Sequence, residues 1–204
     1  MVTADAGLVR LAPRGAESPG KELAAMIVVL SGTNRPDANT RHISRRCAEI
    51  VRAEGEEATV LDLGDLPAAV FAPEAYADTP PEFATWQQAI LDAHGILAVV
   101  PEYNGSFPGV LKYFLDLLRF PESLYEKPCG FIGLASGRYG GVRAVEQLEM
   151  VFQYRQAHLY GRRCFLAGIH QHLDAEGSLV DPALETRLRD TVSGFVEFCR
   201  RLSD

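Results

Sequence analysis

Three short polar segments that contain glycine carry residue types suited to binding a ligand with both a phosphate group and a planar ring. They comprise residues 31–40, 101–109 and 136–141. In the first segment, Arg35 can form charge-assisted hydrogen bonds to phosphate oxygens. Thr33, Asn39 and Thr40 add short hydrogen-bonding side chains, and Gly32 allows a tight backbone turn. The segment predicts a phosphate-binding loop, although a simple polar turn with a helix cap has the same composition.

The other two segments are suited to the planar part of such a ligand. Gly105 keeps the backbone of 101–109 open, so that its amides can lie along the edge of a heteroaromatic ring, and Tyr103 offers a flat face or a hydroxyl beside it. Backbone donors of this kind stabilise the negative charge that develops on a flavin during reduction. A surface loop stabilised by two prolines is the alternative. In 136–141, three glycines indicate either a close backbone approach to a ligand or a strained turn into a helix.

Apolar runs and amphipathic segments alternate along the chain and must position these loops. Buried strands are predicted at 26–30, 59–63, 95–101, 131–135 and 164–169. The first helix is expected to cover Ile43 to Val51, with Asn39 and Thr40 as candidate N-cap residues. Further helices are predicted at 81–93, 108–118, 141–156 and 181–202, and a long irregular stretch at 64–80.

Five strands that alternate with five helices predict a three-layer α/β sandwich around a five-stranded parallel sheet. The expected strand order is 2-1-3-4-5, the flavodoxin-like arrangement, in which ligands bind at the carboxyl ends of strands 1 and 3. Strand 4 lies beside strand 3 in this order. The three polar segments are therefore expected to form one crevice.

Length and composition fit a single flavodoxin-like domain over residues 25–204, preceded by a flexible N-terminal extension over residues 1–24. The net charge of −7 argues against nucleic-acid binding, which needs a basic face. No run approaches the ~18 apolar residues of a membrane helix, and the N-terminus lacks the pattern of a secretory signal. The scattered cysteines are expected to be reduced packing residues of a cytoplasmic protein. They are Cys47, Cys129, Cys164 and Cys199.

At the three loops the sequence resembles the NADPH-dependent FMN reductase family, which includes bacterial chromate, quinone and azo-dye reductases. The resemblance covers about residues 26–200. Its most specific part is 101–106 followed by 108–112 and Asp116, and it is supported by 32–35 with Asn39 and by 140–144.

The resemblance implies a site for non-covalently bound FMN. By position, the phosphate would be held by Thr33, Arg35, Asn39 and Thr40, with Gly32 as the turn residue. The isoalloxazine would be lined by Pro101, Glu102, Tyr103, Asn104, Gly105 and Ser106. The other side would be closed by Ser136, Gly137, Gly140 and Gly141. Family members often carry serine where this chain has Ala38, so one hydrogen bond to the phosphate is expected to be missing.

The resemblance also implies an oxidoreductase that passes a hydride from NADPH or NADH through FMN to a quinone, azo compound, metal oxyanion or free flavin. The flavin carries the chemistry, so no side chain is assigned a catalytic role. An FMN-binding electron-transfer or redox-sensing module without NAD(P)H turnover is the alternative. A response regulator is disfavoured, because it needs aspartates where this chain has Ser31 and Pro101-Glu102.

Related reductases assemble as dimers or tetramers, so a homodimer or homotetramer is expected, with Glu102 and Arg143 at subunit contacts near the site. On helix 141–156, Leu148 and Phe152 suit the core, whereas Met150, Val151 and Tyr154 lie on other faces and indicate either an interface or a broad core stripe. In another part of the chain, residues 170 and 172 are histidines after the fifth strand, where alternate residues point the same way. Because no third ligand is in place, a metal site is not predicted there.

Overall fold

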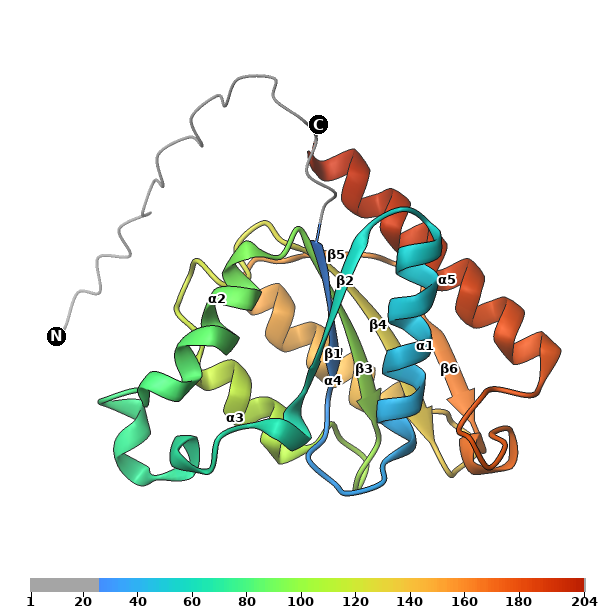
Figure 1. Cartoon of the computed structure of the whole chain (residues 1–204), viewed down its shortest axis with the longest axis horizontal. Helices are drawn as coiled ribbons and strands as arrows, with labels where there is room; N and C mark the ends of the chain where they lie inside the picture. The colour runs from blue at the N-terminus through green and yellow to red at the C-terminus, as the bar shows by residue number, and fades with distance from the viewer. Residues whose placement is uncertain (1–25, 204) are drawn as a thin grey trace, which may run out of the picture.

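The computed structural model describes residues 26–203, and the strands within this range belong to one parallel sheet (Figure 1). The strands are β1 (Met26–Ser31), β2 (Glu57–Asp62), β3 (Gly95–Pro101), β4 (Pro128–Ala135), β5 (His158–Leu159) and β6 (Cys164–Ala167). The helices are α1 (Asn39–Ala53), α2 (Ala84–Asp92), α3 (Gly109–Leu117), α4 (Val142–Tyr154) and α5 (Pro182–Ser203). The order β2-β1-β3-β4-β5 confirms the predicted fold class. The expected extension over residues 1–24 lies outside the described residues.

The fifth position of the sheet is shared by two short strands, whereas the sequence predicts one strand over 164–169. Both β5 and β6 pair with β4. β5 pairs with residues 128–129 of β4, and β6 pairs with residues 132–135 of β4. β6 ends at Ala167 because Gly168 adopts the left-handed conformation, with φ of +60°. The next three residues form a 3-10 turn instead of continuing the strand.

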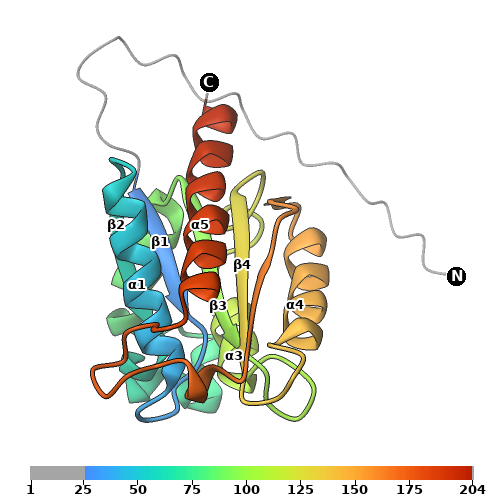
Figure 2. The ribbon, with the colours of Figure 1, turned by 90° about the vertical axis from the view of Figure 1, so that its right-hand side faces the viewer.

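Two apolar cores cover the two faces of the sheet. In β1, Val28 and Leu30 belong to the core with α2, α3 and α4, whereas Ile27 and Val29 belong to the core with α1 and α5. All four side chains are buried. Figure 2 shows α1 and α5 on the face of the sheet that is turned toward the viewer. Because both faces are covered, the strands are continuous apolar runs rather than alternating ones.

Helix α1 begins one residue earlier than its polar residues predict. Ala38, in an extended conformation, occupies the N-cap position and forms no side-chain cap. Asn39 and Thr40 lie within the first turn, so their prediction as N-caps is wrong. The cause is the preceding turn, in which Asp37 has a φ of +51° and brings the chain into the helix before Asn39.

The stretch after β2 is less irregular than expected, because it contains several 3-10 turns. They span Leu63–Asp65, Ala68–Phe71, Pro73–Tyr76 and Pro81–Phe83. α2 therefore begins at Ala84 rather than at Pro81. None of the helices described is long and apolar enough to span a lipid bilayer.

Ion pairs connect the C-terminal helix α5 to helix α1 and to the residue that precedes β2. Nη2 of Arg46 in α1 lies 2.5 Å from Oε1 of Glu185 in α5, and Nε of Arg46 donates to the same carboxylate. This hydrogen bonding lowers the pKa of Glu185 below its usual value. Near the other end of α5, Nε of Arg200 lies 2.6 Å from Oε1 of Glu56.

We expect the free energy of unfolding of Glu185→Gln to fall less than that of the wild-type protein as the pH is lowered. Folding lowers the pKa of Glu185, so its contribution is present above the unfolded pKa and is lost as the pH falls through the folded pKa. Between about pH 7 and about pH 3, the wild-type protein should lose about 1 kcal/mol more free energy of unfolding than the variant. Urea unfolding at both pH values measures this difference. Glu197→Gln, at an exposed position on the same helix, is the control, and an equal acid loss in Glu185→Gln and wild type would contradict the assignment.

Candidate functional site

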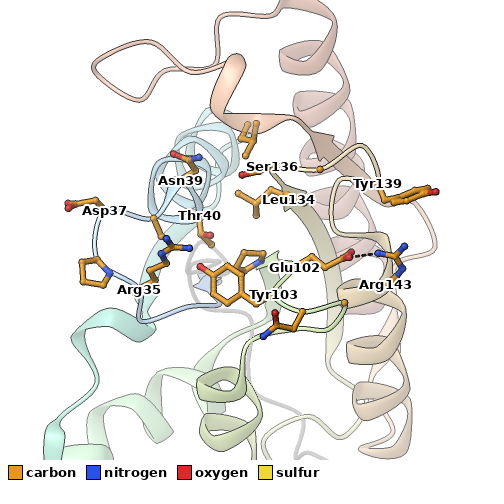
Figure 3. A pocket seen from close by; sticks show the side chains of 18 residues that line it. Arg35, Asp37, Asn39, Thr40, Glu102, Tyr103, Leu134, Ser136, Tyr139 and Arg143 are labelled. Carbon is orange, nitrogen blue, oxygen red and sulfur yellow. Dashed lines mark hydrogen bonds and ion pairs between the residues drawn. The ribbon is translucent and has the colours of Figure 1, made fainter.

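A cavity of about 640 Å³ opens at the carboxyl ends of β1, β3 and β4 (Figure 3). Its volume is within the range of small-molecule and cofactor sites. All three segments identified from their composition contribute to its wall, so they form one crevice as expected. The wall consists of Arg35, Pro36, Asp37, Ala38, Asn39, Thr40, Pro101, Glu102, Tyr103, Asn104, Gly105, Leu134, Ala135, Ser136, Gly137, Tyr139, Arg143 and Ile169.

The loop after β1 presents polar groups without partners at the start of α1. Thr40 is buried, and its Oγ1 has no hydrogen-bond partner. Arg35 is exposed and forms no ion pair with any residue between 26 and 203. The first turn of α1 contains no acidic residue. Because the first N–H groups of a helix lack intrahelical partners and its dipole favours anions, this corner is suited to a phosphate.

Thr33 and Gly32 support the cavity from behind rather than lining it. The hydroxyl of Thr33 donates to Oη of Tyr103 at 3.2 Å and accepts the backbone N–H of Arg35 at 3.2 Å. The N–H of Gly32 donates to the carbonyl oxygen of Val99 in β3 at 2.9 Å. A Cβ on Gly32 would lie only 2.9 Å from the same oxygen. These two residues therefore hold the first loop against β3 and against the second loop.

The second loop forms a tight turn beside the cavity. Tyr103 and Ser106 exchange two backbone hydrogen bonds of 2.9 and 3.1 Å. Asn104 and Gly105 both have positive φ, +52° and +77°, as in a type I′ turn. Nε2 of Gln147 in α4 donates to the carbonyl of Gly105 at 3.0 Å, and Oγ of Ser106 donates to Oε1 of Gln147 at 2.6 Å. Ser106 is thus bonded to α4 and does not line the cavity.

The third loop divides into a lining part and a packing part. Ser136 and Gly137 line the cavity. Gly140 and Gly141 are buried and have φ of +60° and +90°. A Cβ on Gly141 would lie 2.7 Å from the backbone nitrogen of Leu134, and one on Gly140 would lie 2.9 Å from a backbone nitrogen of β6. For this pair of glycines, the strained turn into a helix is the interpretation that the geometry favours.

Glu102 contributes a buried carboxylate to the cavity wall. Its Oε1 accepts a hydrogen bond from Nη1 of Arg143 at 2.7 Å, drawn as a dashed line in Figure 3. Its Oε2 is buried without a partner, and the side chain is 10 % exposed. The pair joins two segments of the same chain, so the assignment of these residues to subunit contacts stays a prediction. The free oxygen can accept an N–H group of a ligand.

The predicted binding residues fall into two groups. Those that line the cavity are Arg35, Asn39, Thr40, Pro101, Glu102, Tyr103, Asn104, Gly105, Ser136 and Gly137. Those that lie outside its wall are Gly32, Thr33, Ser106, Gly140 and Gly141. The sequence did not single out Leu134 and Ile169, because apolar residues at the ends of buried elements look like core residues. Gln147 was missed as well, since a polar residue on an amphipathic helix carries no signal of a distant partner.

The two histidines after β6 do not lie on a strand, so the premise that they point the same way is wrong. The 3-10 turn Ile169–Gln171 contains His170. Nδ1 of His172 lies 3.3 Å from Oδ2 of Asp181. Within residues 26–203, no group of three or more His, Cys, Asp or Glu side chains is arranged to hold a metal ion.

Comparison with known proteins gives consistent matches over most of the chain. A family model described as NADPH-dependent FMN reductase matches residues 25–172. An NADPH:quinone oxidoreductase of Arabidopsis thaliana is 28 % identical over 182 residues, covering 86 % of this chain and 92 % of the relative. A 2-hydroxy-1,4-benzoquinone reductase of a Burkholderia species is 29 % identical over 182 residues, covering 87 % of this chain and 98 % of the relative.

Among solved structures, FerB, a flavoenzyme NAD(P)H:(acceptor) oxidoreductase of Paracoccus denitrificans, superimposes with a TM-score of 0.73. It is 23 % identical, and the match covers 88 % of this chain and 98 % of FerB. An archaeal flavodoxin superimposes with a TM-score of 0.59 at 11 % identity, covering 86 % of this chain and 99 % of the flavodoxin. At these identities the two likenesses support the fold.

We expect Gly141→Ala to destabilise the protein strongly and Gly137→Ala to leave its stability almost unchanged. The left-handed φ of Gly141 and the overlap of a Cβ with β4 together should cost about 3 kcal/mol. A Cβ on Gly137 meets no atom within 4 Å, so that variant should stay within about 0.5 kcal/mol of wild type. Urea unfolding of the cofactor-free proteins measures both values. Equal stabilities of the two variants would show that the packing role of Gly141 is wrong.

Proposed function

Because the chain belongs to the NADPH-dependent FMN reductase family, we propose that it passes a hydride from NAD(P)H through bound FMN to a quinone. It is an oxidoreductase, with FMN as cofactor and NAD(P)H as electron donor. The observation that carries the proposal is a cavity at the sheet edge whose wall combines unpartnered phosphate-type groups with a backbone turn and a buried carboxylate.

The start of α1 fits the phosphate of FMN. Thr40 Oγ1 is a buried hydroxyl without a partner, and such a group costs free energy until a ligand bonds to it. Arg35 adds a guanidinium that is free to form charge-assisted hydrogen bonds. Asn39 lines the same wall. We assign Arg35, Asn39 and Thr40 to direct phosphate contacts, and Gly32 and Thr33 to holding their loop in place.

The part of the cavity wall formed by the second and third loops fits the isoalloxazine ring. Pro101, Tyr103 and Gly105 line it from the second loop, and Ser136 and Gly137 line it from the third. Oε2 of Glu102 is a free acceptor that suits a ring N–H. The bonded Arg143 offsets the charge of Glu102, so the wall does not oppose negative charge that develops on the ligand.

When bound, FMN would supply the redox chemistry, a hydride transfer from NAD(P)H to the acceptor. Overall, NAD(P)H, a proton and a quinone become NAD(P)⁺ and a hydroquinone. The residues of this chain bind and orient the reactants. The Gln147-bonded turn and the Thr33–Tyr103 hydrogen bond keep the second loop rigid beside the cavity. No side chain is assigned a covalent or acid–base step.

A quinone is the acceptor that the relatives favour, since several of them are named quinone reductases. The wall includes flat or apolar side chains next to the polar ones, namely those of Tyr103, Leu134 and Ile169. Such a lining accommodates a planar, uncharged acceptor. Azo compounds, metal oxyanions and free flavin are the other acceptors predicted, and the same assay compares them. A carrier or sensing module is the competing function, and a measurement of steady-state NAD(P)H oxidation distinguishes the two.

Ala38 is expected to weaken the phosphate site. It lines the cavity at the N-cap of α1, where a serine would add a hydroxyl to cap the helix and reach the ligand. We therefore propose that FMN binds with one hydrogen bond fewer than in family members with serine at this position.

We also propose a homodimer or homotetramer. Helix α4 exposes Met150 and Tyr154, with 63 % and 77 % of their surfaces accessible. Phe120, also exposed, stacks on Tyr154 with ring centroids 6.3 Å apart. A group of exposed apolar side chains is typical of an interaction surface. On the same helix, Leu148 and Phe152 are buried in the core, as predicted. Val151 is half-buried and packs against the same core, so its assignment to another face is wrong.

A cytoplasmic location is proposed from the cysteines. All four are free and buried, as expected for packing residues. Burial raises the pKa of Cys164 to about 11 and that of Cys199 to about 12, so these thiols stay protonated near neutral pH. Free, unreactive thiols are typical of proteins in a reducing compartment.

Anaerobic absorbance spectroscopy tests the proposed function. After reconstitution with FMN and removal of unbound flavin, the protein should retain flavin absorbance, and NADPH should bleach it because the hydride reduces the flavin. A quinone added afterwards should restore the absorbance. Retained flavin that NADPH does not bleach would contradict the proposal and favour the carrier function. Failure to retain flavin would contradict the cofactor assignment of the cavity.

A further inference from the structure

An arginine–tyrosine cluster lies at the rim of the cavity, opposite Arg35. The Cζ atoms of Arg138 and Arg143 lie 4.7 and 4.8 Å from the ring centroid of Tyr139. Nη2 of Arg138 also donates to Oη of Tyr139 at 2.6 Å. Figure 3 shows Tyr139 and Arg143 on the side of the cavity away from Arg35. Tyr139 is about half exposed, so the cluster is open to a ligand that enters from solvent.

The cluster carries more positive charge than its surroundings neutralise. Arg143 is paired with Glu102, whereas Arg138 forms no ion pair within the part of the chain that the structure describes. The first turn of α4, which contains Arg143, has no acidic residue. The chain as a whole has a net charge of −7. The guanidinium of Arg138, held on the ring of Tyr139 without an ion pair, suits an anion.

The reactants of the proposed function narrow the choice of anion. NADPH differs from NADH by one phosphate on the adenosine ribose, at the end of the molecule farthest from the nicotinamide. When the nicotinamide lies in the cavity, the adenosine half of the bound dinucleotide must extend over the rim of the cavity toward solvent. The corner with Arg35 and Thr40 is assigned to the phosphate of FMN, which leaves the rim at Tyr139 and Arg143, where Arg138 packs on Tyr139 just outside the wall. A quinone carries no charge that requires such a cluster.

We propose that Arg138, positioned by Tyr139 and supported by Arg143, binds the 2′-phosphate of NADPH and thereby makes the protein prefer NADPH to NADH. This inference rests on the proposed function, because it presupposes that a nicotinamide dinucleotide reaches the cavity. Arg138 is a specificity-determining residue in this account. Tyr139 is a positioning residue, since its ring and hydroxyl hold the guanidinium at the rim.

Steady-state kinetics of three variants test the assignment. Arg138→Ala should raise the KM for NADPH about tenfold and the KM for NADH less than about twofold, because one charge-assisted phosphate contact is lost. Arg138→Lys should recover part of the difference, since it keeps the charge without the guanidinium fork. Arg45→Ala removes an exposed guanidinium on α1, outside the cavity wall, and should leave both KM values unchanged.

Calorimetry on the FMN-loaded protein gives a second readout that does not depend on turnover. The wild-type protein should bind 2′-phospho-ADP-ribose about tenfold more tightly than unmodified ADP-ribose, and Arg138→Ala should abolish this difference in affinity. Equal affinities in the wild-type protein would overturn the inference, as would equal effects of Arg138→Ala on both nucleotides. If Arg138→Ala raised the KM for a sulfonated quinone but not that for neutral benzoquinone, and left the KM for NADPH unchanged, the cluster would be assigned to the acceptor and the inference would be overturned too. If the wild-type protein oxidised neither nucleotide, the proposed function would fail, and the calorimetry would still decide the inference.

Discussion

The close approach of the first loop to β3 is the constraint on which the site depends. Gly32 donates its N–H to the carbonyl of Val99 at 2.9 Å, and a side chain at this position would overlap the same oxygen. The approach brings Thr33 within hydrogen-bond distance of Tyr103, so the phosphate-type loop and the ring-type loop face each other across one cavity. Because parallel strands end at the same edge, the third loop joins them there. The contact between Gly32 and Val99 thus joins the first loop to the second, and the sheet order adds the third.

The cavity wall contains two of the four buried side-chain polar atoms that lack a hydrogen-bond partner in residues 26–203; the other two are Ser31 Oγ and Arg155 Nε. Thr40 Oγ1 and Glu102 Oε2 are buried without partners, and Ala38 provides no cap for α1. Buried polar atoms without hydrogen bonds cost stability, and a ligand that bonds to them offsets this cost. Arg35 lines one side of the cavity and Tyr139, on which the unpaired guanidinium of Arg138 packs, lies on the other side, so two positions for anionic groups are available. A phosphorylated cofactor and a phosphorylated dinucleotide together would occupy both.

The sequence predicted the strand order and the three site-forming loops, because buried parallel strands leave continuous apolar runs and their connections leave polar turns. It did not predict that Gly168 ends β6 early, since αL geometry depends on the tertiary path of the chain. It also did not separate lining residues from supporting ones. Gly141 faces the backbone of β4, and Ser106 is bonded to Gln147 of α4 across 41 residues, so only tertiary contacts reveal their roles. Local composition therefore locates a site, but it does not assign each side chain within it.

The affinities of FMN and riboflavin for the wild-type protein, Arg35→Ala and Arg45→Ala test the central claim most directly. Riboflavin lacks the phosphate, so it isolates the contribution of the corner formed by Arg35 and Thr40. The account predicts that the wild-type protein binds FMN at least about tenfold more tightly than riboflavin. Arg35→Ala should weaken FMN binding about tenfold and leave riboflavin binding unchanged, whereas Arg45→Ala should change neither. Equal affinities of the wild-type protein for both flavins, or full FMN affinity in Arg35→Ala, would contradict the account.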